Sequence, residues 1–156
     1  MRTIAGDNQN LDARSELVYD SAMAENGVLK IGKSTDFQAH MIQHQYGAYT
    51  HTNHGMGLAV IHPALYRHLA PEAPAQFARW AREVWGVDAK GKDDLTVALE
   101  GIDRLQTFIS EIGLPTSFAE MGSDASDETL HKVADTCVLT GGLERSEVFQ
   151  ILTECL

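Results

Sequence analysis

The sequence has few of the features that mark extracellular, nucleic-acid-binding or membrane-spanning proteins. Only two of its 156 residues are cysteines, Cys137 and Cys155, and their spacing fits neither a disulfide framework nor a zinc knuckle. There are 12 Lys and Arg against 22 Asp and Glu, a net charge of −10 without a basic stripe for a phosphate backbone. The longest apolar run, Met56 to Ile61, is too short to cross a bilayer. We therefore expect a cytoplasmic protein with no nucleic-acid partner and no membrane segment.

A nucleotide-binding loop is also absent from the sequence. There is no GxGxxG, no GxxxxGK and no strand–turn–helix unit that could hold a dinucleotide pyrophosphate. No segment alternates apolar and polar residues over the length of a strand. Any nicotinamide cofactor would therefore have to be bound mostly by another polypeptide segment.

Nearly every segment with a clear hydrophobic period shows the helical one. The clearest helix is predicted over 93–112, where apolar residues recur at steps of three and four, and Gly113-Leu114-Pro115 is expected to end it. We predict an all-α, bundle-like helical domain over residues 1–156. The other predicted helices cover 11–29, 36–47, a segment from His54 onward, 74–86, 126–136 and 144–155.

Several local details of these helices are also predicted. Leu11, Val18, Ala22 and Leu29 are expected on one side of the first helix, which Asn26-Gly27 should end or kink. Ser34 or Thr35 is expected to cap the helix over 36–47, and residues 47–53 are expected to form a polar loop. Pro63 should kink or divide the helix that starts at His54. On the helix over 74–86, Phe77, Trp80, Val84 and Trp85 are expected to share one face.

The histidines are concentrated in one stretch. Six of the seven lie between positions 40 and 68, and neutral imidazole is the commonest metal ligand in proteins. Asp36, His40 and His44 are spaced four residues apart, so a helix would place them along one face. From this geometry alone, His40 and His44 are a candidate chelating pair. Asp36 is more simply explained as an acidic residue favoured at a helix N-terminus.

His54 has a different setting, at the expected start of a helix behind Asn53, a good cap. The positive end of the helix dipole favours neutral imidazole, which is the form that binds a cation. A histidine at a helix start is nevertheless more often structural than metal-binding. His51, His62 and His68 have ordinary explanations as buried or surface residues and are not assigned, and His131 is expected at the surface.

Residues 36–66 resemble a signature of the iron-containing (group III) alcohol dehydrogenases. The pattern is His-x3-His-x9-His-Gly, with the histidines at His40, His44 and His54. The segment Leu58-Ala59-Val60-Ile61-His62-Pro63-Ala64-Leu65 resembles the helix that follows it, and weaker similarity extends from about Leu11 to Leu156. The wording His-Met-Ile-x-His resembles the butanol-dehydrogenase-like branch, which usually prefers NADPH and reduces aldehydes.

The resemblance implies a function and a fold, that of the C-terminal, dehydroquinate synthase-like helical domain. It implies that His40 and His54 bind a divalent metal, Fe2+ or Zn2+, and that His44 lies beside the nicotinamide of NADP or NAD, with a role in proton transfer or positioning. This replaces the pair suggested by geometry. The implied reaction is metal-assisted hydride transfer between the nicotinamide and a small primary alcohol or aldehyde, and we expect a homodimer.

The sequence departs from the family pattern in two respects. The family takes an aspartate and a first histidine from an Asp-x3-His segment on an earlier helix, and the only such spacing here, Asp36 to His40, overlaps the second motif. The N-terminal domain with the Gly-Gly-Gly-Ser loop is not found either. We therefore expect a partial enzyme without activity of its own. The alternatives are a non-catalytic helical binding or assembly module derived from such an enzyme and a helical metallohydrolase using Asp36, His40 and His44.

Overall fold

The computed structural model describes all of residues 1–156 and contains helices but no strand, as predicted. No helix combines the length and the apolar composition that crossing a bilayer requires. The helices are α1 (Arg2–Gly6), α2 (Leu11–Glu25), the 3-10 helix η1 (Val28–Lys30), α3 (Gln38–Thr50), α4 (His54–Leu69), α5 (Pro74–Trp85), α6 (Asp94–Glu111), α7 (Phe118–Met121), α8 (Asp127–Thr136) and α9 (Arg145–Thr153).

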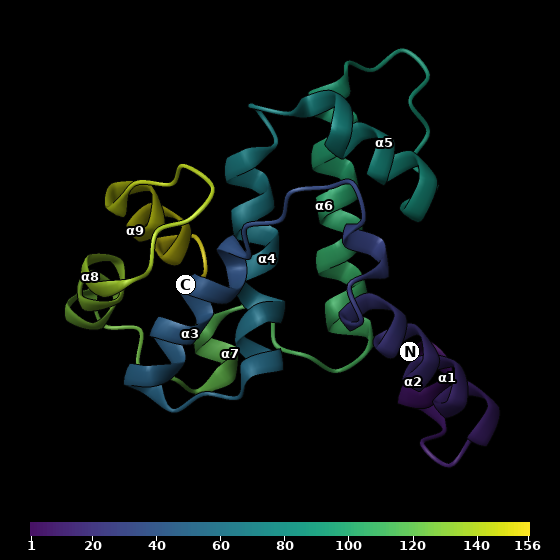
Figure 1. Cartoon of the computed structure of the whole chain (residues 1–156), viewed down its shortest axis with the longest axis horizontal. Helices are drawn as coiled ribbons and strands as arrows, with labels where there is room; N and C mark the ends of the chain where they lie inside the picture. Colours follow the sequence, from purple (N-terminus) through teal and green to yellow (C-terminus); the bar gives the residue numbers. More distant parts are fainter.

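Helix α4 occupies the middle of the molecule. It packs against α3, α7 and α9 on one side and against α6 on the other, and α5 covers α6 (Figure 1). Two polar contacts accompany this packing: Arg67 donates to Asp103 on α6 at 2.6 Å, and His68 Nε2 lies 3.1 Å from Glu147 Oε1 on α9. The adjacent residues Arg67 and His68 of α4 therefore contact helices on opposite sides of α4.

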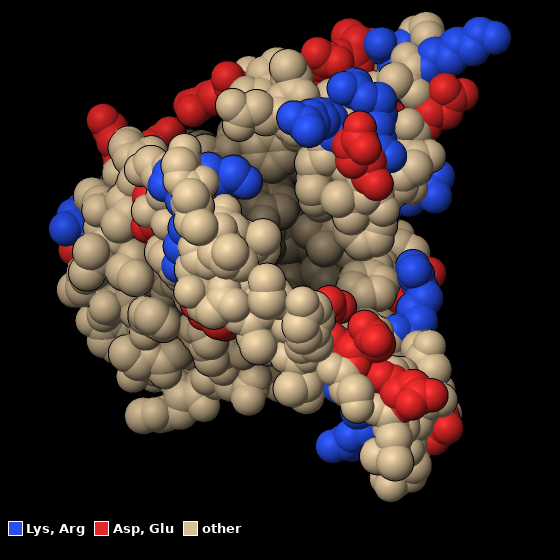
Figure 2. Space-filling view, turned by 45° about the vertical axis from the view of Figure 1, so that its right-hand side comes forward, with Lys and Arg blue, Asp and Glu red and all other residues tan.

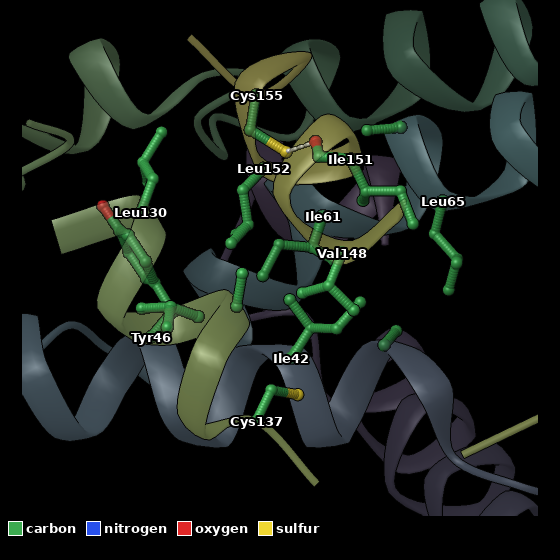
Figure 3. Packing of buried hydrophobic residues seen from close by; sticks show 14 of the residues in the cluster. Ile42, Tyr46, Ile61, Leu65, Leu130, Cys137, Val148, Ile151, Leu152 and Cys155 are labelled. Atoms are coloured by element: carbon green, nitrogen blue, oxygen red, sulfur yellow. Dashed lines mark hydrogen bonds between the residues drawn. The ribbon is translucent and has the colours of Figure 1, made fainter. Parts of the chain in front are cut away.

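The larger core lies between α3, α4, α7, α8 and α9. Its seventeen buried hydrophobic residues include the side chains labelled in Figure 3. Tyr46 of α3 stacks on Phe118 of α7 with ring centroids 4.1 Å apart. The Tyr46 hydroxyl lies 2.6 Å from Ser123 Oγ and donates to the Asp124 carbonyl at 3.1 Å, so the one polar atom of this ring is satisfied. This core fixes α3 against α4.

The pair α5–α6 forms the second half of the fold. Asp93 caps α6 by accepting a hydrogen bond from the Thr96 backbone amide at 2.7 Å. Of the apolar face predicted over 93–112, Ile102 and Ile109 are buried and the other residues are partly buried. The two helices approach closely at Gly101, where a Cβ would overlap Ala81 Cβ and lie 3.2 Å from Trp80 Cζ3. The prediction that Val84 shares the apolar face of α5 is wrong, because Val84 is 61% exposed.

The N-terminal segment differs from the rest of the chain. Helix α2 starts at Leu11, as predicted. It ends at Glu25, short of residue 29, because Asn26-Gly27 terminates it, one of the two outcomes expected there, with Gly27 in a left-handed conformation (φ 85°) before η1. None of its residues is buried, and Leu11 and Val18 of the predicted apolar side are 76% and 69% exposed. The pattern predicted a helix correctly, but nothing in this chain covers its apolar side.

The boundaries predicted around the histidines need three corrections. Ser34 and Thr35 do not cap α3, because Phe37 adopts a left-handed conformation (φ 55°) and α3 begins only at Gln38. The predicted loop over 47–53 is mostly helical, since α3 continues to Thr50 before His51 (φ 54°) ends it. Pro63 does not divide α4, whose helical hydrogen bonding runs from His54 to Leu69 around a buried proline.

Candidate metal and catalytic site

Three histidine rings converge where the N-terminal half of α3 faces the start of α4. The ring centroids of His40 and His54 are 5.2 Å apart, those of His44 and His54 are 5.1 Å apart, and those of His40 and His44 are 6.0 Å apart. The signature therefore corresponds to a spatial cluster. His44 and His54 are exposed, whereas His40 is half-buried.

Local structure explains how the three rings meet. One helical turn separates His40 from His44 on α3, so both project to the same side. After the short connection from His51 to Asn53, the Asn53 side chain accepts a hydrogen bond from the Met56 amide at 3.1 Å and caps α4. This cap, which the sequence predicted, makes His54 the first residue of α4 and returns it toward α3.

The environment favours the neutral form of His40. Burial lowers the pKa of His40, and the nearby imidazoles of His54, His62 and His44 lower it further, while Glu25 acts in the opposite direction. A histidine must be neutral to donate its lone pair to a metal ion. The clustering of imidazoles therefore prepares His40 for that role.

A buried glutamine contacts this cluster. Gln43 is only 2% exposed, the single polar residue among the buried ones, and its Oε1 forms a hydrogen bond with His54 Nδ1. An amide oxygen can only accept, so His54 Nδ1 is the donor in this pair. No feature of the sequence pattern alone predicted a role for Gln43. The sequence feature that could have indicated its burial is a glutamine between His40 and His44 that is followed one helical turn later by a glycine, Gly47.

The donor set suits a divalent metal in part. Two imidazoles on one tetrahedral ion, with metal–nitrogen distances of about 2.0–2.1 Å, have ring centres roughly 5 Å apart, close to the separation of His40 and His54. No group of three or more His, Cys, Asp or Glu side chains is arranged to hold an ion by itself. The chain thus offers two fitting nitrogen ligands rather than a complete set.

The other candidates do not complete such a set. Asp36 precedes α3, so it is not on the helical face with His40, and its carboxylate accepts from the Gln38 amide at 3.3 Å. Burial lowers the pKa of His62, whose Nδ1 contacts the Leu58 carbonyl at 2.9 Å. His131 is exposed, as predicted, and stacks on Phe149 at 4.0 Å.

A hollow opens beside the histidines. One cavity of about 400 Å³ lies between α4 and α6, is lined mostly by apolar side chains and begins at Gly55, next to His54. A second, of about 330 Å³, is bounded by the segment 35–40 and by α4, and His62 and Tyr66 line both. Figure 2 shows the molecule hollowed near the middle of one face, with mostly uncharged atoms around the hollow. The histidine cluster therefore lies at the edge of an apolar depression.

The sequence of this chain is similar to those of known proteins. A family model described as "Fe-containing alcohol dehydrogenase family, C-terminal" matches residues 1–148. A probable NADH-dependent butanol dehydrogenase of Bacillus subtilis is 33% identical over 159 residues, which cover 98% of this chain and 41% of that protein. An NADPH-dependent aldehyde reductase of Escherichia coli is 28% identical over 118 residues, covering 76% of this chain and 30% of that protein.

Comparison with solved structures agrees with the sequence matches. The crystal structure of NADH-dependent butanol dehydrogenase A from Thermotoga maritima superimposes with a TM-score of 0.88 and 25% identity, over 98% of this chain and 41% of that one. The chain thus spans about two fifths of the length of these relatives. Together with the histidine signature, these matches show that the chain belongs to the iron-containing alcohol dehydrogenase family and corresponds to its C-terminal helical part.

Proposed function

We propose that this chain is the metal-binding part of a nicotinamide-dependent alcohol dehydrogenase or aldehyde reductase. The observation that carries the proposal is the convergence of His40, His44 and His54 from two helices, with ring centroids 5.1–6.0 Å apart. The named relatives are NADH-dependent butanol dehydrogenases and an NADPH-dependent aldehyde reductase, which supports a nicotinamide cofactor and a small primary alcohol or aldehyde as substrate.

Each histidine has a separate role in this proposal. His40 and His54 hold a divalent ion, Fe2+ or Zn2+, through one imidazole nitrogen each. When bound, the metal supplies a Lewis acid next to the substrate oxygen. His44, exposed and within 5.1 Å of the His54 ring, lies beside the nicotinamide, where it orients the substrate or exchanges its proton with solvent.

The remaining parts of the catalytic centre come from outside the residues described above. The nicotinamide requires a nucleotide-binding domain, because this chain has no glycine-rich loop for a pyrophosphate. That domain would also decide between NADH and NADPH, since the adenosine end of the cofactor lies with the loop. Two further ligands complete the metal site, and the assembled enzyme acts in the cytoplasm as a homodimer.

Metal titration tests the proposed site directly. Zn2+ added to the 156-residue chain should bind weakly, and His40→Ala or His54→Ala should each lower the affinity at least about 10-fold, because each removes half of the donor set. His131→Ala, at an exposed histidine outside the cluster, is the matched control and should leave binding unchanged. Calorimetry provides the measurement. Binding that depends on His40 and His44 but not on His54 would contradict the proposal and favour the metallohydrolase alternative.

Activity provides an independent test. The chain alone should not reduce butanal with NADPH or NADH above background, because it lacks half of the ligands and the nucleotide loop. The same assay on the chain joined to a nucleotide-binding domain should show reduction that requires His44. Reduction by the 156-residue chain that His54→Ala abolishes would show that the site is complete without other segments.

A further inference from the structure

The side chain of Gln43 lies in a slot between two glycines. A Cβ at Gly57 of α4 would lie 2.8 Å from Gln43 Cγ, and one at Gly47 of α3 would lie 3.0 Å from Gln43 Nε2. Real Cβ atoms essentially never come closer than 3.0 Å, so a methyl group at Gly57 would displace the glutamine, and one at Gly47 would force its amide to move by a few tenths of an ångström. The glycines therefore make room for a buried amide at the point where α3 and α4 meet.

The buried amide of Gln43 contacts a single histidine. Gln43 Oε1 hydrogen-bonds His54 Nδ1 across the two helices. In a neutral imidazole only one nitrogen carries a proton, and a proton on Nδ1 leaves Nε2 as the nitrogen with a free lone pair. The hydrogen bond therefore selects one tautomer of His54 and fixes the ring plane at the same time.

We propose that Gln43 is a positioning residue that fixes His54 with its proton on Nδ1, so that Nε2 is the nitrogen available to a metal ion. Because Gln43 and His40 belong to α3 whereas His54 begins α4, the glutamine also ties together the two helices that supply the two nitrogen ligands. This inference rests on the proposed function for the identity of the ligand, but the tautomer of His54 can be measured without any metal.

The first measurement concerns the tautomer. Nitrogen-15 spectra of the imidazole rings of the metal-free chain at pH 8, where an ordinary histidine is neutral, should show a protonated Nδ1 and an unprotonated Nε2 for His54. His54→Ala identifies the signal. Gln43→Leu, of similar size but without an acceptor, should give the mixture of tautomers found in a free, solvent-exposed histidine side chain. Gln43→Glu keeps an acceptor and should keep the Nδ1 proton.

The second measurement concerns the metal. Gln43→Leu should weaken Zn2+ binding about 10- to 100-fold, the usual cost of removing a partner that orients a ligand. Gln43→Glu should restore it, which a merely structural role for the side chain would not predict. Gln45→Leu, on the same helix next to His44, is the matched control. Gly57→Ala should reproduce the effect of Gln43→Leu, because its methyl group displaces the amide from the far side of the slot.

The outcomes separate this inference from the proposed function. A His54 proton on Nε2 in the wild-type chain, or unchanged Zn2+ affinity in a Gln43→Leu variant whose circular dichroism spectrum is native, would overturn the role of Gln43. A proton on Nδ1 that depends on Gln43, together with no binding of Zn2+, would support the positioning of His54 and count against the proposed metal site alone. If Gln43→Leu does not fold, the Nδ1 proton and the Zn2+ affinity are compared in Gln43→Glu, which should keep both, and Gly57→Ala, which should lose both. Equal results for these two variants would overturn the role of Gln43.

Discussion

Helix α2 and the lobe around α3 and α4 are both helical, yet only one of them buries apolar side chains. In α2, Leu11, Val18 and Tyr19 are all more than 60% exposed, and no residue is buried. In the lobe, Tyr46 and Phe118 are fully buried and stack on each other. An apolar pattern therefore encodes a helix, whereas stability and the placement of a site depend on a partner surface.

Replacing one aromatic residue in each region should give the largest difference. Phe118→Ala removes a fully buried ring from the main core and should lower the free energy of unfolding by about 3–5 kcal/mol. Tyr19→Ala on α2, where the ring is 63% exposed, should change it by less than about 0.5 kcal/mol. Urea denaturation followed by circular dichroism measures both. Equal losses would mean that α2 has a packing partner in solution.

The buried thiol of Cys155 makes stability depend on alkaline pH. Burial raises the pKa of Cys155 to about 12 from its ordinary value of 9.0. The folded chain keeps this proton while the unfolded chain loses it, so the stabilisation is complete below pH 9 and declines above it by about 1.4 kcal/mol per pH unit, until pH 12.

Cys155→Ala provides the comparison for this effect. The difference in stability between the wild-type chain and this variant should shrink from pH 8 to pH 10, measured by urea denaturation. In the wild-type chain a thiol reagent should modify neither Cys155 nor Cys137, both buried, until the chain unfolds. A cysteine placed at the exposed Ser15 of α2 should react at once. Rapid modification of Cys155 in the folded chain would refute the burial argument.

A hydroxyl deletion should give a smaller effect that still separates buried from exposed sites. Tyr46→Phe leaves the stacking on Phe118 but removes two hydrogen bonds, to Ser123 and Asp124, and should cost about 1 kcal/mol. Tyr49→Phe removes one exposed hydrogen bond to Thr136 and should cost less than about 0.5 kcal/mol. Thermal unfolding measures the loss of stability in each variant. A larger loss for Tyr49→Phe than for Tyr46→Phe would contradict the prediction.

Where local chemistry determines the structure, the sequence was sufficient. Asn53 caps α4 and Gly113 follows the end of α6, because a short polar side chain is required at the first position and a positive φ at the second. The convergence of His40 and His54 was implied by the family resemblance, whereas the period of the helix alone favoured His40 with His44. A helical period describes one element and cannot show which element faces it.

The failures have the same physical origin. No propensity predicts that Phe37 and His51 adopt left-handed conformations, because residues other than glycine rarely do so. The short helix α7 carries no period that could be recognised, although its Phe118 is central to the core. Gln43 looks like an ordinary polar residue in the sequence. Its burial follows only from the meeting of α3 and α4 at Gly47 and Gly57.

The tight crossing of α5 and α6 at Gly101 has a consequence for the neighbouring depression. Trp80 and Trp85 of α5 line the same cavity as Leu105, Phe108 and Ile109 of α6, so the spacing of the two helices sets the width of that cavity. One added methyl group at position 101 would overlap Ala81 and crowd Trp80, so α5 would have to move relative to α6. The width of the cavity that Gly55 lines, next to His54, therefore depends on the absence of a side chain at Gly101, where α5 and α6 cross.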